Sequence, residues 1–110
     1  MRASVFYFAL LAGQMNTLQQ RTVVRLQPHQ DVIKTEFGGK LVELINAPAV
    51  IQLPKLPPKQ DSLGEPWSIE VRNLGPGKVT VVGNRLFSVL INAGQTAQIM
   101  SNGLNYSSAK

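Results

Sequence analysis

Short runs of β-branched and other apolar residues recur along this chain, and each is closed by glycine, proline or asparagine. The clearest run is residues 67–73, in which Trp67, Ile69 and Val71 alternate with polar residues. Alternation with a period of two places the two sets of side chains on opposite faces of a strand. The 9 glycines and 7 prolines interrupt any long helical pattern. The chain is therefore predicted to be an all-β protein.

The other runs predict closely spaced strands. The expected strands cover residues 21–26, 31–37, 40–45, 49–53, 67–73, 78–82, 86–91, 95–101 and 104–107. Gly38 and Gly39 stand between two of these runs and predict a two-residue hairpin. Residues 54–66 hold four prolines and predict a surface loop. About eight or nine short strands at this spacing favour an antiparallel, jelly-roll-like β-sandwich.

The length of 110 residues fits one domain, and we expect an N-terminal arm at residues 1–19 followed by a single β-sandwich domain at residues 20–110. The arm begins like a signal peptide but lacks a small-x-small cleavage site, and its apolar stretch is shorter than the ~20 residues that span a bilayer. Residues 9–20 have the propensity for one helix. Packing on the chain's own core or on a neighbouring subunit would bury the same apolar area, so both alternatives stay open. The candidate partner-interface residues are Val5, Phe6, Tyr7, Phe8, Leu10 and Leu11.

Residue types that carry catalysis or bind metals are sparse and dispersed. The chain has no cysteine, and its one histidine, His29, follows Pro28 in a predicted turn. No two of the six carboxylates form the spacing of a calcium loop, and no carboxylate has the spacing to a histidine of a zinc protease. Pro76 removes one of the amides that a phosphate cradle at Gly75–Gly77 would need. We therefore predict no enzymatic activity, no cofactor and no metal site.

The charge balance of 11 Lys/Arg against 6 Asp/Glu gives a formal net charge of +5, which raises nucleic acid or an acidic partner as possible ligands. The cations are scattered along the chain, however. Trp67 shares a strand face with Ile69 and Val71, which predicts a core residue and not a platform on which bases stack. This distribution argues against nucleic acid as the main partner.

The carboxyl-terminal half carries an ordered set of motifs. In chain order they are the strand ending in Leu53-Pro54, the strand from Trp67 to Asn73, the glycine-rich turn and Thr-Val strand of residues 75–83, the Gly94-Gln95 bend, and the close Ser101-Asn-Gly-Leu-Asn-Tyr106. Over residues 49–106 they resemble a β-sandwich module of tailed-bacteriophage virion proteins, most of all the jelly-roll capsid decoration (cement) proteins of short-tailed phages similar to epsilon15. Leu104 departs from this pattern, because small polar residues are commoner at that point of the closing turn.

The resemblance implies a structural virion protein that binds the outer surface of the major capsid protein shell and stabilises it. It implies a homodimer on the capsid surface, made in the host bacterial cytoplasm, with no membrane partner, and it carries over no catalytic residue. The same sandwich also serves as a tail or fibre accessory module that binds a host-surface glycan or another tail protein, so this alternative stays open. Outside the arm, only Tyr106 is expected to offer an exposed aromatic ring to a sugar, which disfavours the glycan alternative.

Overall fold

The computed structural model of the protein describes residues 22–109, and this part of the chain is nearly all-β, as predicted. The strands are β1 (Val23–Leu26), β2 (Leu41–Leu44), β3 (Ala49–Gln52), β4 (Ser68–Asn73), β5 (Val79–Val82), β6 (Ser88–Ile91), β7 (Thr96–Ser101) and β8 (Tyr106–Ala109). Within the described residues, the one helix is a 3₁₀ turn at Thr35–Phe37. The arm at residues 1–19 and the helix predicted at residues 9–20 lie outside the described residues.

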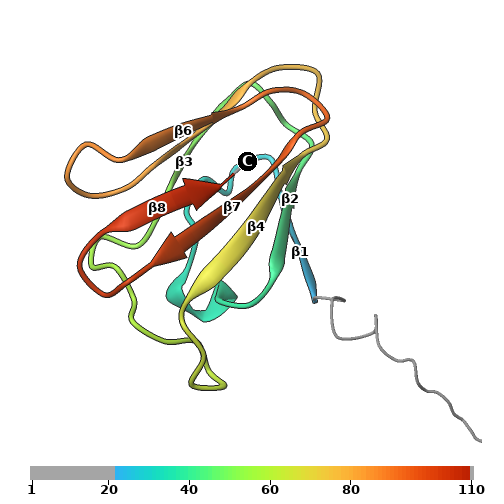
Figure 1. Cartoon of the computed structure of the whole chain (residues 1–110). Helices are drawn as coiled ribbons and strands as arrows, with labels where there is room; N and C mark the ends of the chain where they lie inside the picture. The colour runs from blue at the N-terminus through green and yellow to red at the C-terminus, as the bar shows by residue number, and fades with distance from the viewer. Residues whose placement is uncertain (1–21, 110) are drawn as a thin grey trace, which may run out of the picture.

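The strands form two sheets that pack face to face (Figure 1). One sheet has five strands in the order β1-β2-β4-β7-β8, and the other has three in the order β3-β5-β6. Strand β1 runs parallel to β2, β2 to β4, and β3 to β5, while the other neighbouring pairs are antiparallel. The prediction of an antiparallel sandwich was therefore wrong, since both sheets are mixed. Parallel neighbours need a crossover, and here the chain visits the opposite sheet between them.

Residues 31–37 provide one of these crossovers and are not the strand that was predicted. Val32 forms an isolated parallel bridge with Gln52 at the edge of β3, and the amide of Ile33 donates to the Gln52 carbonyl at 2.7 Å. The side chain of Ile33 is completely buried there. The chain then returns through the 3₁₀ turn to the five-stranded sheet. This detour makes β2 parallel to β1.

The hairpin predicted at Gly38 and Gly39 was wrong for the same reason, since these glycines lead from the 3₁₀ turn into β2. A Cβ atom on Gly38 would lie 2.5 Å from the indole of Trp67. Gly39 has a φ of +82°, a conformation that glycine adopts without steric penalty. These two glycines thus serve close packing and chain direction instead of a two-residue turn.

The core confirms the alternation predicted for residues 67–73. The side chains of Trp67, Ile69 and Val71 are fully buried, with 0% relative exposure. The Trp67 Nε1 atom donates a hydrogen bond to the Thr35 carbonyl at 2.8 Å, so the one polar atom of the ring is satisfied. Buried residues of the facing sheet and of the neighbouring strand β7 complete the centre: Val79 and Val81 of β5, Ile91 of β6, and Ala97 and Ile99 of β7.

Candidate functional site

The interface residues predicted in the arm, Val5, Phe6, Tyr7, Phe8, Leu10 and Leu11, lie outside the described residues. The candidate site is therefore built from residues 22–109. The connections between strands gather at opposite ends of the sandwich, and the two ends differ in chemistry (Figure 1).

One end is organised around the side chain of Asn73, which is fully buried at the end of β4. Its Nδ2 atom donates to the carbonyls of Gly77 at 2.7 Å and Ile91 at 3.0 Å, and its Oδ1 atom accepts from the Gly75 amide at 2.9 Å. One side chain thus satisfies three backbone groups that would otherwise lose hydrogen bonds on burial. We call this the closed end; it comprises residues 45–48, 73–78 and 92–95.

Close backbone packing completes the closed end. A Cβ atom on Gly75 would lie 2.7 Å from the Ala47 amide nitrogen, and one on Gly77 would lie 2.9 Å from the Pro48 nitrogen. Real Cβ atoms do not approach backbone so closely, so only glycine fits without a shift of the chain. The backbone segments at this end are therefore packed closely against one another around the Asn73 side chain.

The opposite end exposes large apolar side chains. The relative exposure is 84% for Leu56, 99% for Leu86 and 67% for Leu104. We call this the leucine end; it comprises residues 53–59, 83–87 and 102–105. These segments lie together on the left of Figure 1, beyond the ends of β3, β5 and β7.

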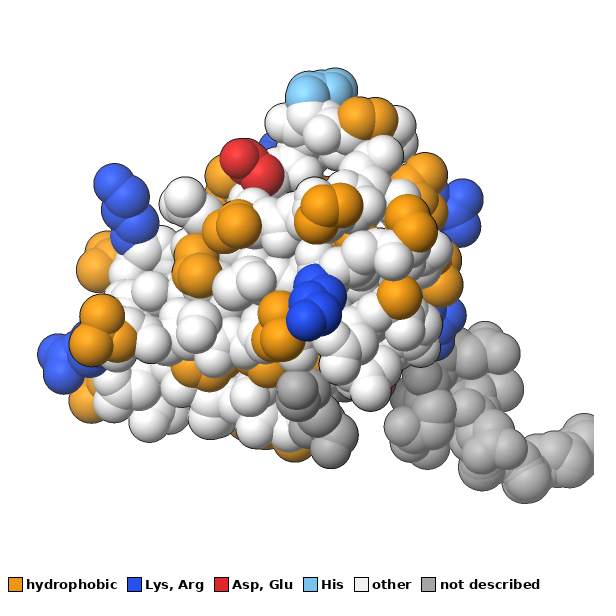
Figure 2. Space-filling view, turned by 90° about the horizontal axis from the view of Figure 1, so that it is seen from above, with side chains coloured by type: hydrophobic (Ala, Val, Ile, Leu, Met, Phe, Trp, Pro, Cys, Tyr) orange, Lys and Arg blue, Asp and Glu red, His pale blue; other side chains and the backbone are white. Residues whose placement is uncertain are grey.

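The same segments carry the exposed cations Lys55, Lys59 and Arg85. None of them forms an ion pair within residues 22–109, where the ion pairs join Glu43 to Arg25 and Arg72. Hydrophobic and basic side chains lie side by side on the left of Figure 2, where the view shows this end from above. The leucine end therefore combines exposed apolar area with positive charge that has no carboxylate partner in the described chain.

Hydrogen bonds from buried side chains hold the loops of the leucine end in place. The hydroxyl of Tyr106 donates to the Pro54 carbonyl at 2.6 Å, and that of Ser101 donates to the Pro58 carbonyl. The Nδ2 atom of Asn84 donates to the Leu104 carbonyl at 3.3 Å, which joins two of the loops. These hydrogen bonds hold the surface in one arrangement without a partner. Burial raises the pKa of Tyr106 from 10.0 to about 12.

Tyr106 itself cannot serve as the exposed sugar platform that the sequence suggested. Its side chain is buried, at 7% relative exposure, and its ring lies against those of Trp67 and Phe87. The centroid distances are 6.2 Å to Trp67 and 5.8 Å to Phe87. The tyrosine supports the loop from beneath, so its role is structural.

The hairpin between β5 and β6 places two non-glycine residues in the left-handed region. Arg85 has a φ of 52° and Leu86 a φ of 64°, and the Phe87 amide donates to the Asn84 carbonyl at 3.0 Å. A tight turn with positive φ at both central residues normally has Asn-Gly there. Each residue with a Cβ atom in this region is strained by about 1–2 kcal/mol. The hairpin thus accepts strain while presenting an arginine and a leucine to solvent.

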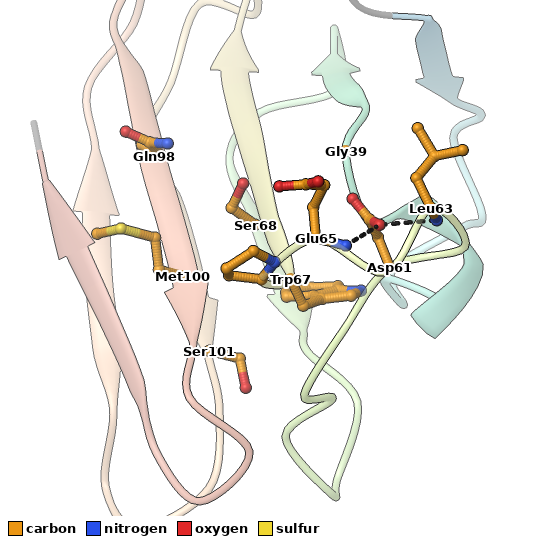
Figure 3. A pocket seen from close by; sticks show the side chains of 10 residues that line it. Gly39, Asp61, Leu63, Glu65, Trp67, Ser68, Gln98, Met100 and Ser101 are labelled. Atoms are coloured by element: carbon orange, nitrogen blue, oxygen red, sulfur yellow. Dashed lines mark hydrogen bonds between the residues drawn. The ribbon is translucent and has the colours of Figure 1, made fainter.

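A hollow of about 500 Å³ lies on the outer side of the five-stranded sheet. Its floor is formed by Ser68, Gln98 and Met100, and the loop that carries Asp61 and Glu65 forms its wall (Figure 3). The Oδ1 atom of Asp61 accepts the amides of Leu63 at 2.8 Å and Glu65 at 3.0 Å, so this oxygen is used to shape the loop. The indole of Trp67 borders the hollow but is fully buried, and it exposes no ring face.

A row of charged side chains crosses the outer face of the same sheet. Arg25, Glu43 and Arg72 occupy paired positions on β1, β2 and β4. The Glu43 carboxylate accepts from Arg25 at 2.9 Å and from Arg72 at 3.3 Å, and its side chain is 8% exposed. These arginines are partnered within the sheet, unlike the cations of the leucine end.

Residues 22–109 hold no group of three or more histidine, cysteine, aspartate or glutamate side chains placed to bind a metal ion. In the same residues no helix has the length and apolar character to cross a membrane. No family model, curated protein or solved structure matches this chain. The geometry of the described residues and the motif order of the sequence therefore carry the functional argument.

Sequence reasoning missed the leucine end, although one signal was present. Leu104 stands out as an apolar residue in a closing turn where small polar residues are commoner. Leu56 lies in the loop that the prolines predicted, and Leu86 was assigned to the strand now formed by residues 88–91. The three loops come to one end only through the packing of the two sheets.

Proposed function

We propose that this chain is a structural virion protein, a capsid decoration subunit that binds the outer surface of the major capsid protein shell and stabilises it. The observation that carries the proposal is the motif order of residues 49–106, whose strand signals fall on β3–β7 and whose closing turn leads into β8. The jelly-roll assignment belongs to this proposal. The eight strands in two sheets agree with a jelly roll in number, whereas the parallel pairs depart from it.

A capsid decoration subunit requires a rigid body with an exposed contact surface. Rigidity is supported by one core shared by both sheets and by loops tied at both ends through Asn73 and Tyr106. The formal charge of +5 favours an acidic capsid exterior, because complementary charge accelerates and orients the encounter. A homodimer on the capsid surface, and the absence of a catalytic role, are parts of the same proposal.

The test uses the full chain and shells assembled from the major capsid protein of the same virus. Saturable co-sedimentation at a fixed ratio of subunits to shell protein, together with greater resistance of the shells to heat, is the expected result. A full chain that is folded, by circular dichroism, and yet fails to bind the shells at micromolar concentration would overturn the proposal.

The arm is tested in the same assay with Phe6→Ser and Phe8→Ser in the full chain. If the arm packs on a neighbouring protein, shell binding weakens while the urea midpoint of the free subunit stays unchanged. If it packs on its own domain, the midpoint falls instead. The two outcomes separate the alternatives that the sequence leaves open.

The second candidate function is a tail or fibre accessory module that binds a host-surface glycan or another tail protein. The hollow over the five-stranded sheet favours it, since polar Ser68 and Gln98 lie beside apolar Met100. The buried state of Trp67 and Tyr106 weakens it, because neither ring face is available for stacking. Binding of host-surface polysaccharide that Gln98→Ala abolishes, with no binding to shells, would support this alternative over the first.

A further inference from the structure

We propose that the leucine end is the docking surface of the subunit and that its occupant is an acidic face of the shell protein. This inference rests on the proposed function and specifies which part of the described chain makes the contact. It differs from the arm interface expected from the sequence, because it assigns contact residues to three loops of the sandwich itself.

The three leucines of the leucine end are highly exposed. Leu56, Leu86 and Leu104 expose 84%, 99% and 67% of their surface, although one core of the same protein buries most other large apolar residues. At the closed end, the corresponding exposed residues Ile45 and Leu74 are only about half exposed, at 50% and 49%. Apolar area gathered at one end is typical of a contact surface, and burying it would stabilise a complex.

The loops that carry these leucines also carry positive charge. Lys55, Lys59 and Arg85 lie in the same segments and have no carboxylate partner within residues 22–109. Among the described arginines, Arg25 and Arg72 are paired with Glu43, whereas Arg85 at the leucine end is not. Uncompensated positive charge around an apolar centre is complementary to an acidic rim around an apolar patch.

The surface of the leucine end is concave. A hollow of about 240 Å³ lies at the base of these loops, lined by Gln52, Leu53, Lys55, Val82, Gly83 and Asn84. Its lining combines apolar walls with amide groups and one ammonium group, which suits a carboxylate-bearing side chain of a protein. A flat lipid surface would leave this concavity unfilled.

The loops of the leucine end are held in place by hydrogen bonds. The hydroxyls of Tyr106 and Ser101 and the amide of Asn84 hold the three loops together, so little conformational freedom is lost on binding. The strained φ values of Arg85 and Leu86 point the same way, because strain persists at positions that the surrounding structure holds in place. A second copy of this chain is a poor occupant, since a twofold contact would place the cations of one copy against those of the other.

The test compares matched variants of the full chain on the same shells. The leucine variant carries Leu56→Ser, Leu86→Ser and Leu104→Ser; its control carries Ile45→Ser, Val50→Ser and Leu74→Ser, which are exposed residues outside the leucine end. The charge variant carries Lys55→Glu and Arg85→Glu; its control carries Lys34→Glu and Lys78→Glu, which changes the net charge equally. Urea unfolding establishes that each variant is folded.

We expect the leucine variant to bind shells at least about 100-fold more weakly, because three apolar side chains lose their burial. The charge variant should bind about 10-fold more weakly, with a flatter dependence on salt, and both controls should stay within about 2-fold of the wild type. Wild-type binding that the leucine and charge variants leave unchanged would overturn the docking surface alone. Failure of the wild type to bind shells would overturn the proposed function, and the docking partner with it.

Two further measurements identify a different occupant. Flotation with vesicles of phosphatidylcholine and phosphatidylserine tests a lipid surface, and sedimentation velocity of the free chain tests a second copy. If the wild type and the control bind vesicles or dimerise and the leucine variant does not, then the lipid surface or the second copy is the occupant instead of the shell protein. Absence of vesicle binding and of any dimerisation that depends on the three leucines, with the expected shell binding, supports the proposal.

Discussion

The loops that connect the strands are held in different ways at the closed end and at the leucine end of this sandwich. At the closed end, a fully buried Asn73 satisfies three backbone groups, and the backbone at Gly75 packs directly on that of Ala47. At the leucine end, the supporting bonds come from beneath, through Tyr106 and Ser101, and the loop tips project apolar and basic side chains into solvent. The arrangement at the closed end contributes to the stability of the fold. The arrangement at the leucine end leaves apolar and basic side chains exposed to solvent.

The largest expected difference between the ends concerns two asparagines. Asn73→Ala leaves the Gly77 and Ile91 carbonyls and the Gly75 amide without a partner in a buried site, so we expect a loss of at least about 3 kcal/mol in the free energy of unfolding. Asn102→Ala is the matched control at the leucine end. Its Oδ1 atom accepts two amides at 2.8 and 2.7 Å, but the site is exposed and water replaces it, so the loss should be below about 1 kcal/mol.

Urea unfolding measures the free energy of unfolding of both variants. The slope of this free energy against urea concentration should be the same as in the wild type. Equal losses for the two asparagines would contradict the view that the closed end contributes more to stability.

Glycine substitutions probe the same contrast in backbone packing. A Cβ atom at Gly75 would lie 2.7 Å from the Ala47 nitrogen, so Gly75→Ala should destabilise the protein by about 2–3 kcal/mol through displacement of the chain. Gly103, at the leucine end, has a φ of +91°, and a Cβ atom there would have no neighbour closer than 3.5 Å. Gly103→Ala should therefore show only conformational strain, about 1 kcal/mol. Thermal unfolding by calorimetry ranks the two, and a larger loss at Gly103 would argue against tight packing at the closed end.

The strained hairpin of the leucine end should respond in the opposite direction. Replacing Arg85 by Asn and Leu86 by Gly supplies the residues that a turn with two positive φ values favours, so the free energy of unfolding should rise by about 1 kcal/mol. Shell binding should fall at the same time, because the exposed leucine and one cation are lost. A double variant that is less stable than the wild type in urea would show that the hairpin is unstrained.

The smallest effect concerns the support beneath the leucine end. Tyr106→Phe removes the hydrogen bond to the Pro54 carbonyl and should lower the free energy of unfolding by about 1 kcal/mol at neutral pH. Burial raises the pKa of Tyr106 in the folded protein from 10.0 to about 12, so the folded state holds this proton more tightly than the unfolded state. The contribution is complete below pH 10 and is lost as the pH rises from 10 to about 12.

Urea midpoints of the wild type and of Tyr106→Phe between pH 8 and pH 12 measure this dependence. The wild type should lose stability more steeply than the variant above pH 10, and parallel curves would show that the hydroxyl is not buried in the folded protein.

The class of the fold and the inward faces of most strands follow from local sequence patterns. Alternation in residues 67–73 identified Trp67, Ile69 and Val71 as core, because a strand turns successive side chains to opposite sides whatever its partner is. Turn residues likewise placed seven of the strands within two residues of their observed bounds, and the last, β8, is shifted by two residues at both its start and its end. These properties are local, so a single chain segment contains the information for them.

Strand pairing and strand direction, in contrast, depend on contacts between distant segments. Residues 31–37 were expected to be a strand because Gly38 and Gly39 follow them, but Ile33 is buried against the other sheet, and the chain crosses over instead of folding back as a hairpin. The leucine end could not be predicted from the sequence either, because Leu56, Leu86 and Leu104 are far apart in sequence. They come to the same end of the sandwich only because β3, β5 and β7 end there. Which strands become neighbours depends on how much apolar area segments distant in sequence bury against one another. A local sequence pattern does not contain this information.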